Sequence, residues 1–129
     1  MTVSVDNVDF LQPVEVGELV SLHASVNYVG RTSLVVGIRV EALDVRTNSV
    51  KHTNSSFFTM VAKDEHDRPA IVPPLILETR EDVKRFIEAM NVRSVKGKMK
   101  TEMNDARSHV DIANAADLLK KERCVLAWK

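Results

Sequence analysis

Two consecutive runs of strict alternation constrain the fold of this chain more than any other feature. Apolar residues occupy every second position from Val20 to Tyr28, and the alternation resumes from Leu34 to Ala42 after a GRTS break. A period of two is typical of a β-strand with one face in the core and one face in water. A short break that contains glycine, between two such runs, indicates a hairpin. The opposite face of the second run carries Gly37, Arg39 and Glu41.

Further strands are expected on both sides of this hairpin. A polar turn around residues 47–49 leads into TNSSFFTMVA, which is partly apolar on both faces and so predicts a central strand covered on two sides. The start, TVSVDNVDFL, is strand-like, but its phase slips, which predicts a bulge near Asp6 and Asn7. Strands of roughly ten residues are long, and long antiparallel strands twist strongly. We therefore expect a curled sheet whose concave apolar face must be filled.

Helices are expected only in the second half of the chain. Three prolines within residues 69–74 end the sheet. Thr79 and Asp82 resemble a capping box, and apolar residues then follow at helical spacing. These are Val83, Phe86, Ile87 and Met90. Residues 93–107 are polar and basic and predict a loop or a frayed helix, and a second helix is predicted over residues 108–121.

Charge is balanced over the whole chain but not along it. The sequence has 18 basic and 18 acidic residues, with a net charge of −4 in residues 1–79 and +4 in residues 80–129. The basic part either presents a solvated helix surface or meets phosphate groups or an acidic patch on a neighbour. A single cysteine excludes an internal disulfide. Because no apolar run approaches a membrane span and no signal-peptide pattern opens the chain, we expect a soluble cytoplasmic protein without a membrane partner.

Most catalytic and binding motifs are absent from the sequence. Four scattered histidines and one cysteine do not make a zinc pattern, so no metal site is expected. There is no glycine-rich nucleotide motif and no nucleophile elbow. The basic residues between 93 and 100 have no interleaved aromatics, which argues against nucleic acid.

The GRTS turn is the strongest candidate site. Arg31 offers a fixed positive fork, and the hydroxyls of Thr32 and Ser33 can donate to phosphate oxygens. The alternative interpretation is a plain hairpin turn.

Three motifs together resemble a known family. They are VDNVDFLQPVEVGE near the start, VGRTS in the middle and PPLILET before the helix. Over residues 2–90 the chain resembles the acyl-CoA thioesterases of the hot-dog fold. The resemblance implies an α+β, hot-dog-like architecture, a curled antiparallel sheet of long strands followed by C-terminal helices. Residues 1–90 would form the hot-dog-like domain and residues 91–129 a basic helical tail.

The resemblance also implies an activity, partners and a binding site. The activity is hydrolysis of acyl-CoA to free fatty acid and CoA, with no cofactor, because coenzyme A is part of the substrate. The partners are further copies of the chain, in a dimer or hexamer joined through strand edges. Coenzyme A is expected near Arg31, Thr32 and Ser33, with Asn54 and Arg68 flanking the same strand and its exit.

No catalytic residue can be assigned in this chain from the resemblance. In the family an Asp acts as general base, and an Asn or a backbone N–H polarises the thioester carbonyl. These groups lie in an N-terminal strand, loop and wrapped central helix that precede the stretch beginning here at Thr2. Such a helix contributes roughly 6–15 kcal/mol of apolar burial, as much as the whole stability of a domain. The expected groove would then be filled in a longer chain, by a partner chain or by residues 108–121.

Three functions follow from these alternatives. The chain is an acyl-CoA thioesterase or the main part of one, a non-catalytic hot-dog subunit that binds acyl-CoA or completes an oligomer, or a structural domain whose basic tail binds an acidic partner.

Overall fold

A computed structural model of the protein describes residues 1–5 and 8–127. The chain divides into two compact units, Met1–Val92 and Arg93–Lys129. The first unit contains the four strands and the first turns of a long helix. The second contains the rest of that helix and a short second one.

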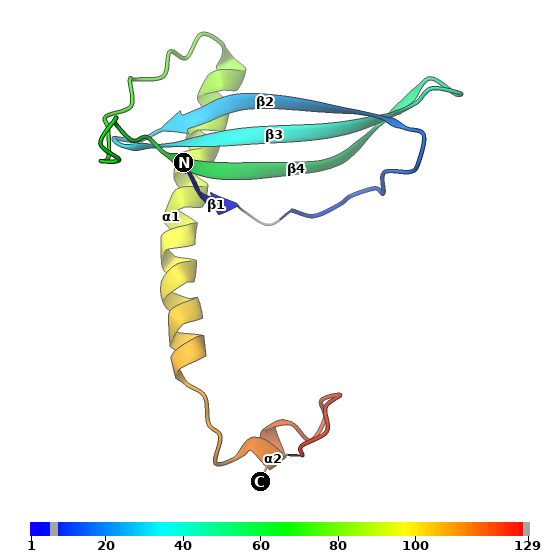
Figure 1. Ribbon diagram of the computed structural model, residues 1–129, viewed down its shortest axis with the longest axis vertical. Coiled ribbons are helices and arrows are strands. Elements are labelled where there is room, and N and C mark those ends of the chain that lie inside the picture. The colour runs from blue at the N-terminus through cyan, green and yellow to red at the C-terminus, as the bar shows by residue number, and fades with distance from the viewer. Residues whose placement is uncertain (6–7, 128–129) are drawn as a thin grey trace. The chain divides into compact units, whose positions relative to one another are not determined.

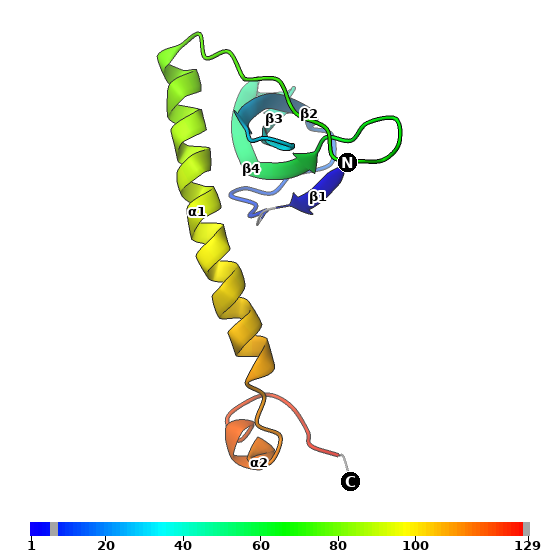
Figure 2. The same cartoon turned by 90° about the vertical axis from the view of Figure 1, so that its left-hand side faces the viewer.

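The four strands form one antiparallel sheet. They are β1 (Thr2–Val5), β2 (Leu19–Val29), β3 (Ser33–Asp44) and β4 (Ser49–Val61). Their order is β1-β4-β3-β2, so that β4 is an inner strand, as its two apolar faces indicated, and β2 is an edge (Figure 1). The sheet curls strongly when viewed along its strands (Figure 2). The expected α+β, hot-dog-like class is confirmed, with strands of 11, 12 and 13 residues in β2, β3 and β4.

Both hairpins form where the sequence placed them. The turn between β2 and β3 is closed by the Gly30 N–H, which donates to the Ser33 carbonyl at 2.8 Å. The turn between β3 and β4 contains Asn48 at a φ of 56°, a left-handed conformation that asparagine tolerates better than most residues. The alternation from Leu34 to Ala42 therefore does put one set of side chains on one face of β3.

The prediction that Tyr28 shares a face with Val20, Leu22, Ala24 and Val26 is wrong. Val26 pairs with Val36, but Tyr28 pairs with Val35, because the register shifts between Val26 and Tyr28. Residues paired across two strands share a face, so the bulge moves Tyr28 to the face of Val35. Alternation in the sequence continues through the bulge, which is why the shift was invisible there.

The start of the chain departs from the expected long strand. β1 ends at Val5, and its register shifts between Thr2 and Ser4. The bulge predicted near Asp6 and Asn7 lies outside the described residues. Further along, the Leu11 N–H donates to the Thr53 carbonyl at 2.7 Å, so this segment returns to β4 without forming a regular strand.

The helix α1 (Arg80–Ser108) begins where the capping box predicted it. The Asp82 N–H donates to Thr79 Oγ1 at 3.1 Å, and the Thr79 N–H donates back to Asp82 Oδ2 at 3.1 Å. These reciprocal bonds satisfy two N–H groups that the first helical turn would otherwise leave unpaired.

Two predictions about the C-terminal part are wrong. Residues 93–107 are helical within α1, because the lysines, arginines, methionines and glutamate there are good helix formers and a single Gly97 costs only about 1 kcal/mol. The predicted helix over 108–121 is reduced to α2 (Ala115–Leu118), only four residues long. Short isolated helices are marginal in water without tertiary packing, and no residue of α2 is buried.

The sheet buries little apolar surface. Ala42 is the one buried hydrophobic residue among those described, and the buried polar residues there are Asn27, Thr53, Asn54 and Ser56. On the face that alternation marked as the core face, Val20, Leu22 and Val26 are 41%, 65% and 43% exposed. We call this the open face; it consists of Val20, Leu22, Ala24 and Val26 with their cross-strand neighbours on β3 and β4. The expected apolar face is present; its β2 residues are open to solvent, whereas Ala42, Asn54 and Ser56 on the inner strands are buried.

Candidate coenzyme A site and the relatives of the chain

The candidate site is built at the β2–β3 turn. Arg31 is exposed at the tip, and Thr32 and Ser33 are half-buried where β3 begins. The Thr32 carbonyl accepts the Ala62 N–H at 2.9 Å, and the Arg31 carbonyl accepts the Val72 N–H at 2.8 Å. The backbone of the turn is therefore held by the segment that leaves β4, which leaves the Arg31 side chain outside these backbone bonds.

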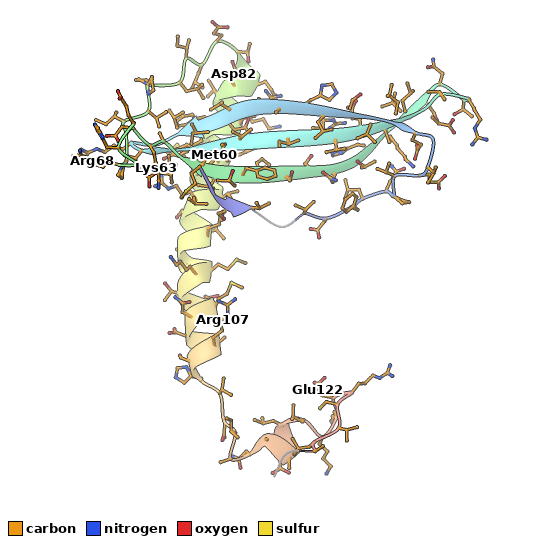
Figure 3. The ribbon with its side chains drawn as sticks, in the orientation of Figure 1. Met60, Lys63, Arg68, Asp82, Arg107 and Glu122 are labelled. Carbon is orange, nitrogen blue, oxygen red and sulfur yellow. The ribbon has the colours of Figure 1, made fainter. Side chains whose placement is uncertain are left out.

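That segment, residues 62–72, forms a return loop that folds back on itself. Lys63 and Pro69 make an antiparallel bridge, and the Ala70 N–H donates to the Ala62 carbonyl at 3.0 Å. Arg68 lies in this loop and is exposed. Lys63 and Arg68 lie together at the end of the sheet where β4 ends (Figure 3). Since the loop bonds to Arg31 and Thr32, the structure brings Arg68 to the same end of the sheet as the GRTS turn.

Asn54 is not part of this arrangement. It is 5% exposed and pairs with Val40 in the middle of the sheet, so it lies on the open face. Val40 lies seven positions after Ser33 along β3, roughly 23 Å at the usual rise of a strand. Asn54 belongs to the same long strand whose exit contacts the GRTS turn, but it lies too far along that strand to reach the turn.

A polar cluster on the face opposite the open face was only partly visible in the sequence. Arg39 Nε contacts Glu41 Oε1 at 2.8 Å, and His23 Nε2 lies 3.6 Å from Glu41 Oε2. The hydrogen bond from Arg39 lowers the pKa of the Glu41 carboxyl, and the charges of Arg39 and the two neighbouring histidines act in the same direction. The His23 side chain is 63% exposed. The cluster holds Glu41 ionised, which favours a structural ion pair over an acid-base role.

Other chemistry finds little support in the described residues. No three side chains among His, Cys, Asp and Glu in the described ranges lie close enough together to bind a metal ion. Cys124 is exposed near the C-terminus. No helix in residues 8–127 combines the length and the apolar content that a bilayer crossing needs.

A protein-family model matches the N-terminal part of the chain, which includes the GRTS turn. Residues 1–49 match the model of the thioesterase superfamily. This stretch contains β1, β2, the GRTS turn and β3. The chain is similar to the hot-dog fold acyl-CoA thioesterases. The resemblance inferred from the three sequence motifs is confirmed.

Curated proteins similar to this chain come from bacteria and mammals. Protein VdlD of Helicobacter pylori is 41% identical over 96 residues, 74% of this chain and 55% of that protein. The uncharacterized acyl-CoA thioester hydrolase YkhA of Bacillus subtilis is 35% identical over 64% of this chain and 48% of its own length. The cytosolic acyl coenzyme A thioester hydrolase of Rattus norvegicus is 31% identical over 68% of this chain and 24% of its own length. The chain thus spans about half the length of the bacterial relatives.

Solved structures extend the likeness to the fold. An acyl-CoA hydrolase from Bacillus cereus superposes with a TM-score of 0.75 at 28% identity, covering 87% of this chain and 68% of that one. A hexameric acyl-CoA thioesterase gives 0.73 at 34% identity, covering 78% and 64%. A Staphylococcus aureus acyl-CoA hydrolase in complex with butyryl coenzyme A and coenzyme A gives 0.62 at 28% identity, covering 81% and 68%. The first of these matches covers more of the chain than residues 1–90, to which the sequence motifs were confined.

Proposed function

We propose that this chain is the main part of an acyl-CoA thioester hydrolase and binds coenzyme A at the β2–β3 turn. The observation that carries the proposal is the joint between the turn and the return loop, in which Ala62 and Val72 donate to the carbonyls of Thr32 and Arg31. This joint holds Arg31 and Arg68 at one end of the sheet. Guanidinium groups are well suited to phosphates, and coenzyme A carries three phosphate groups.

The proposed site differs from the sequence-based one in two respects. Arg31, Thr32, Ser33 and Arg68 remain in it, because the return loop joins the segments that carry them. Asn54 is left out, because it lies in the middle of the sheet. Lys63 is added, because it lies beside Arg68 at the exit of β4 (Figure 3).

The chemistry of the proposed reaction is addition of water to the thioester carbonyl. It requires a general base for the water and a donor for the developing oxyanion. The proposal assigns neither to residues 1–129. In the resembled family these groups accompany the central helix, and the open face is the surface on which such a helix would pack. Apolar residues exposed at 41–65%, such as Val20 and Leu22, support a face that is covered in the active assembly.

A homo-oligomer and a cytoplasmic location belong to the same proposal. A solved relative is named as hexameric, and the rat relative is named as cytosolic. Strand β2 lies at an edge of the sheet, which supports association through strand edges. Light scattering on the purified chain tests this part: we expect the mass of a dimer or a hexamer, and a monomer would contradict it.

A second function remains in competition. A non-catalytic hot-dog subunit would bind acyl-CoA without cleaving it. Release of free thiol from a medium-chain acyl-CoA separates the two. Release supports the hydrolase, and coenzyme A binding without release supports the subunit.

The binding site has its own test with a matched control. Arg31→Ala should raise the Kd for coenzyme A roughly tenfold, the loss expected for one charge-assisted phosphate contact. Arg46→Ala is the control, because Arg46 lies in the hairpin turn at the opposite end of the sheet and its side chain is 89% exposed. Equal effects of the two substitutions, or no binding by the unaltered chain, would contradict the proposed site and leave a structural domain as the better account.

A further inference from the structure

One carboxylate in the return loop accepts hydrogen bonds from the loop's own backbone. Asp64 Oδ1 accepts the His66 N–H at 2.9 Å and the Arg68 N–H at 3.0 Å. The Asp64 N–H donates to the Arg68 carbonyl at 2.8 Å, and the Asp67 N–H donates to the Asp64 carbonyl at 3.1 Å. Asp64 and Arg68 are therefore joined in both directions. Asparagine and aspartate form such turns because their short side chains reach N–H groups two residues further on.

These hydrogen bonds around Asp64 lie in the same loop that contacts the β2–β3 turn. The loop includes Asp67 at a φ of 61°, a left-handed conformation that costs free energy in a non-glycine residue. Lys63 Nζ lies 3.1 Å from Asp67 Oδ1 and closes the loop from the side-chain direction. On either side of these bonds, the N–H groups of Ala62 and Val72 donate to the carbonyls of Thr32 and Arg31. Two sets of contacts therefore fix the Arg68 backbone relative to the Arg31 turn.

The acidic composition of the loop makes this role necessary. Asp64, Glu65 and Asp67 would repel an anion if all three faced it. The Asp64 carboxylate accepts hydrogen bonds from backbone N–H groups and the Asp67 carboxylate pairs with Lys63, so two of the three carboxylates have partners within the loop. Arg68 is exposed beside them.

We propose that Asp64 is a positioning residue, which holds the return loop so that Arg68 and Arg31 present their guanidinium groups to the same phosphate-bearing ligand. The inference rests on the proposed coenzyme A site. It concerns the geometry of the Asp64 acceptor and not its charge. A negative charge near a phosphate weakens binding, so a purely electrostatic role predicts that removing the charge strengthens it.

Two substitutions separate geometry from charge. Asp64→Asn keeps an oxygen acceptor at the same place and loses the charge. Asp64→Glu keeps the charge, but its extra methylene carries the carboxylate past the two N–H groups. Glu65→Gln is the matched control, because it removes a charge from the exposed neighbouring residue of the same loop.

The measurements are calorimetric titration of coenzyme A into the full chain and amide hydrogen exchange without ligand. We expect Asp64→Glu to raise the Kd roughly five- to tenfold, since the loop must then be ordered on binding, and to speed exchange at the amides of Ala62 and Val72. Asp64→Asn should bind as the unaltered chain does or more tightly, like Glu65→Gln, and leave exchange at both amides unchanged.

The possible failures can be told apart. Unchanged binding by Asp64→Glu, together with weakened binding by Arg31→Ala, would overturn the role of Asp64 and leave the proposed site intact. Weakening by Asp64→Asn as large as by Asp64→Glu would overturn the geometric role, because the acceptor is retained. Absence of coenzyme A binding by the unaltered chain would overturn the proposed site and this inference together.

Discussion

The ring of Tyr28 on β2 contacts the ring of Phe86 on α1, with the ring centroids 4.9 Å apart and the ring planes tilted by 46°. The bulge after Val26 makes this contact possible, because it moves Tyr28 to the face opposite the open face. Offset and tilted aromatic pairs contribute about 0.5–1.5 kcal/mol beyond the area they bury. The pair therefore anchors the first turns of α1 on the face opposite the open face.

Replacement of Phe86 should release this part of α1 from the sheet. We expect Phe86→Ala to lower the free energy of unfolding by about 2 kcal/mol, which combines the aromatic pair with loss of partial burial. Urea denaturation of the full chain measures the loss. Ile87→Ala is the control, because Ile87 is the next helical residue and is 50% exposed. A loss for Ile87→Ala as large as that for Phe86→Ala would show that the ring contact is not what anchors the helix.

Gly37 should not tolerate a side chain while Asn27 is present. An added Cβ at Gly37 would collide with the Asn27 side-chain amide, whose Cγ lies 3.2 Å away. Asn27 is 8% exposed and accepts a hydrogen bond from Ser25 Oγ at 2.7 Å, so the amide cannot move freely. We expect Gly37→Ala to destabilise the chain by about 1–3 kcal/mol.

A double-mutant cycle identifies the cause of that loss. Combining Gly37→Ala with Asn27→Ala should cost less than the sum of the two single changes, because the second removes the obstacle. Thermal unfolding of all four proteins gives the coupling. Strict additivity would show that the cost of Gly37→Ala arises from strand backbone effects and not from the Asn27 amide.

The N-terminus of α1 should weaken in acid. Hydrogen bonds from the Thr79 and Glu78 N–H groups lower the pKa of the Asp82 carboxyl in the folded protein. A carboxyl whose pKa is lower in the folded than in the unfolded state stabilises the fold above its unfolded value of about 3.9. That stabilisation is lost as the pH falls through the lower folded pKa.

Asp82→Asn should remove this part of the acid dependence. Circular dichroism from pH 6 to pH 2 on both proteins measures it, and the difference in stability between them should shrink below about pH 4. Glu88→Gln, a change at an exposed position further along α1, provides a comparison. A difference between Asp82→Asn and the unaltered chain that stays constant with pH would contradict the assigned cause.

Leu22 tests whether the open face is free in solution. Its side chain is 65% exposed, so Leu22→Ser should change the free energy of unfolding by less than about 1 kcal/mol in the chain alone. It should also lower the fluorescence of a dye that binds exposed apolar surface. A loss of 2 kcal/mol or more would mean that another segment or another copy covers the face, because only a buried leucine costs that much to remove.

The sequence alone was enough to predict those features that depend on local pattern. Alternation placed β2, β3 and their turn, and the spacing of Thr79 and Asp82 placed the start of α1. The same patterns indicated the apolar face and, with the three motifs, the family. Strand period and helix capping are set by neighbouring residues, so both can be predicted from a single sequence.

What the sequence left undecided depended on contacts between distant residues. The bulge at Tyr28 is invisible in the alternation because a register is a property of two strands and not of one. Asn54 and Arg68 were both expected to flank the coenzyme A site, yet only the return loop reaches the GRTS turn, through backbone bonds that pair residues about 30 to 40 positions apart. The hydrogen bonds of Asp64 likewise depend on the loop conformation, which the sequence did not reveal. Residue types and periods determined the elements of this protein, and tertiary hydrogen bonds decided which of its charged residues lie at the same end of the sheet.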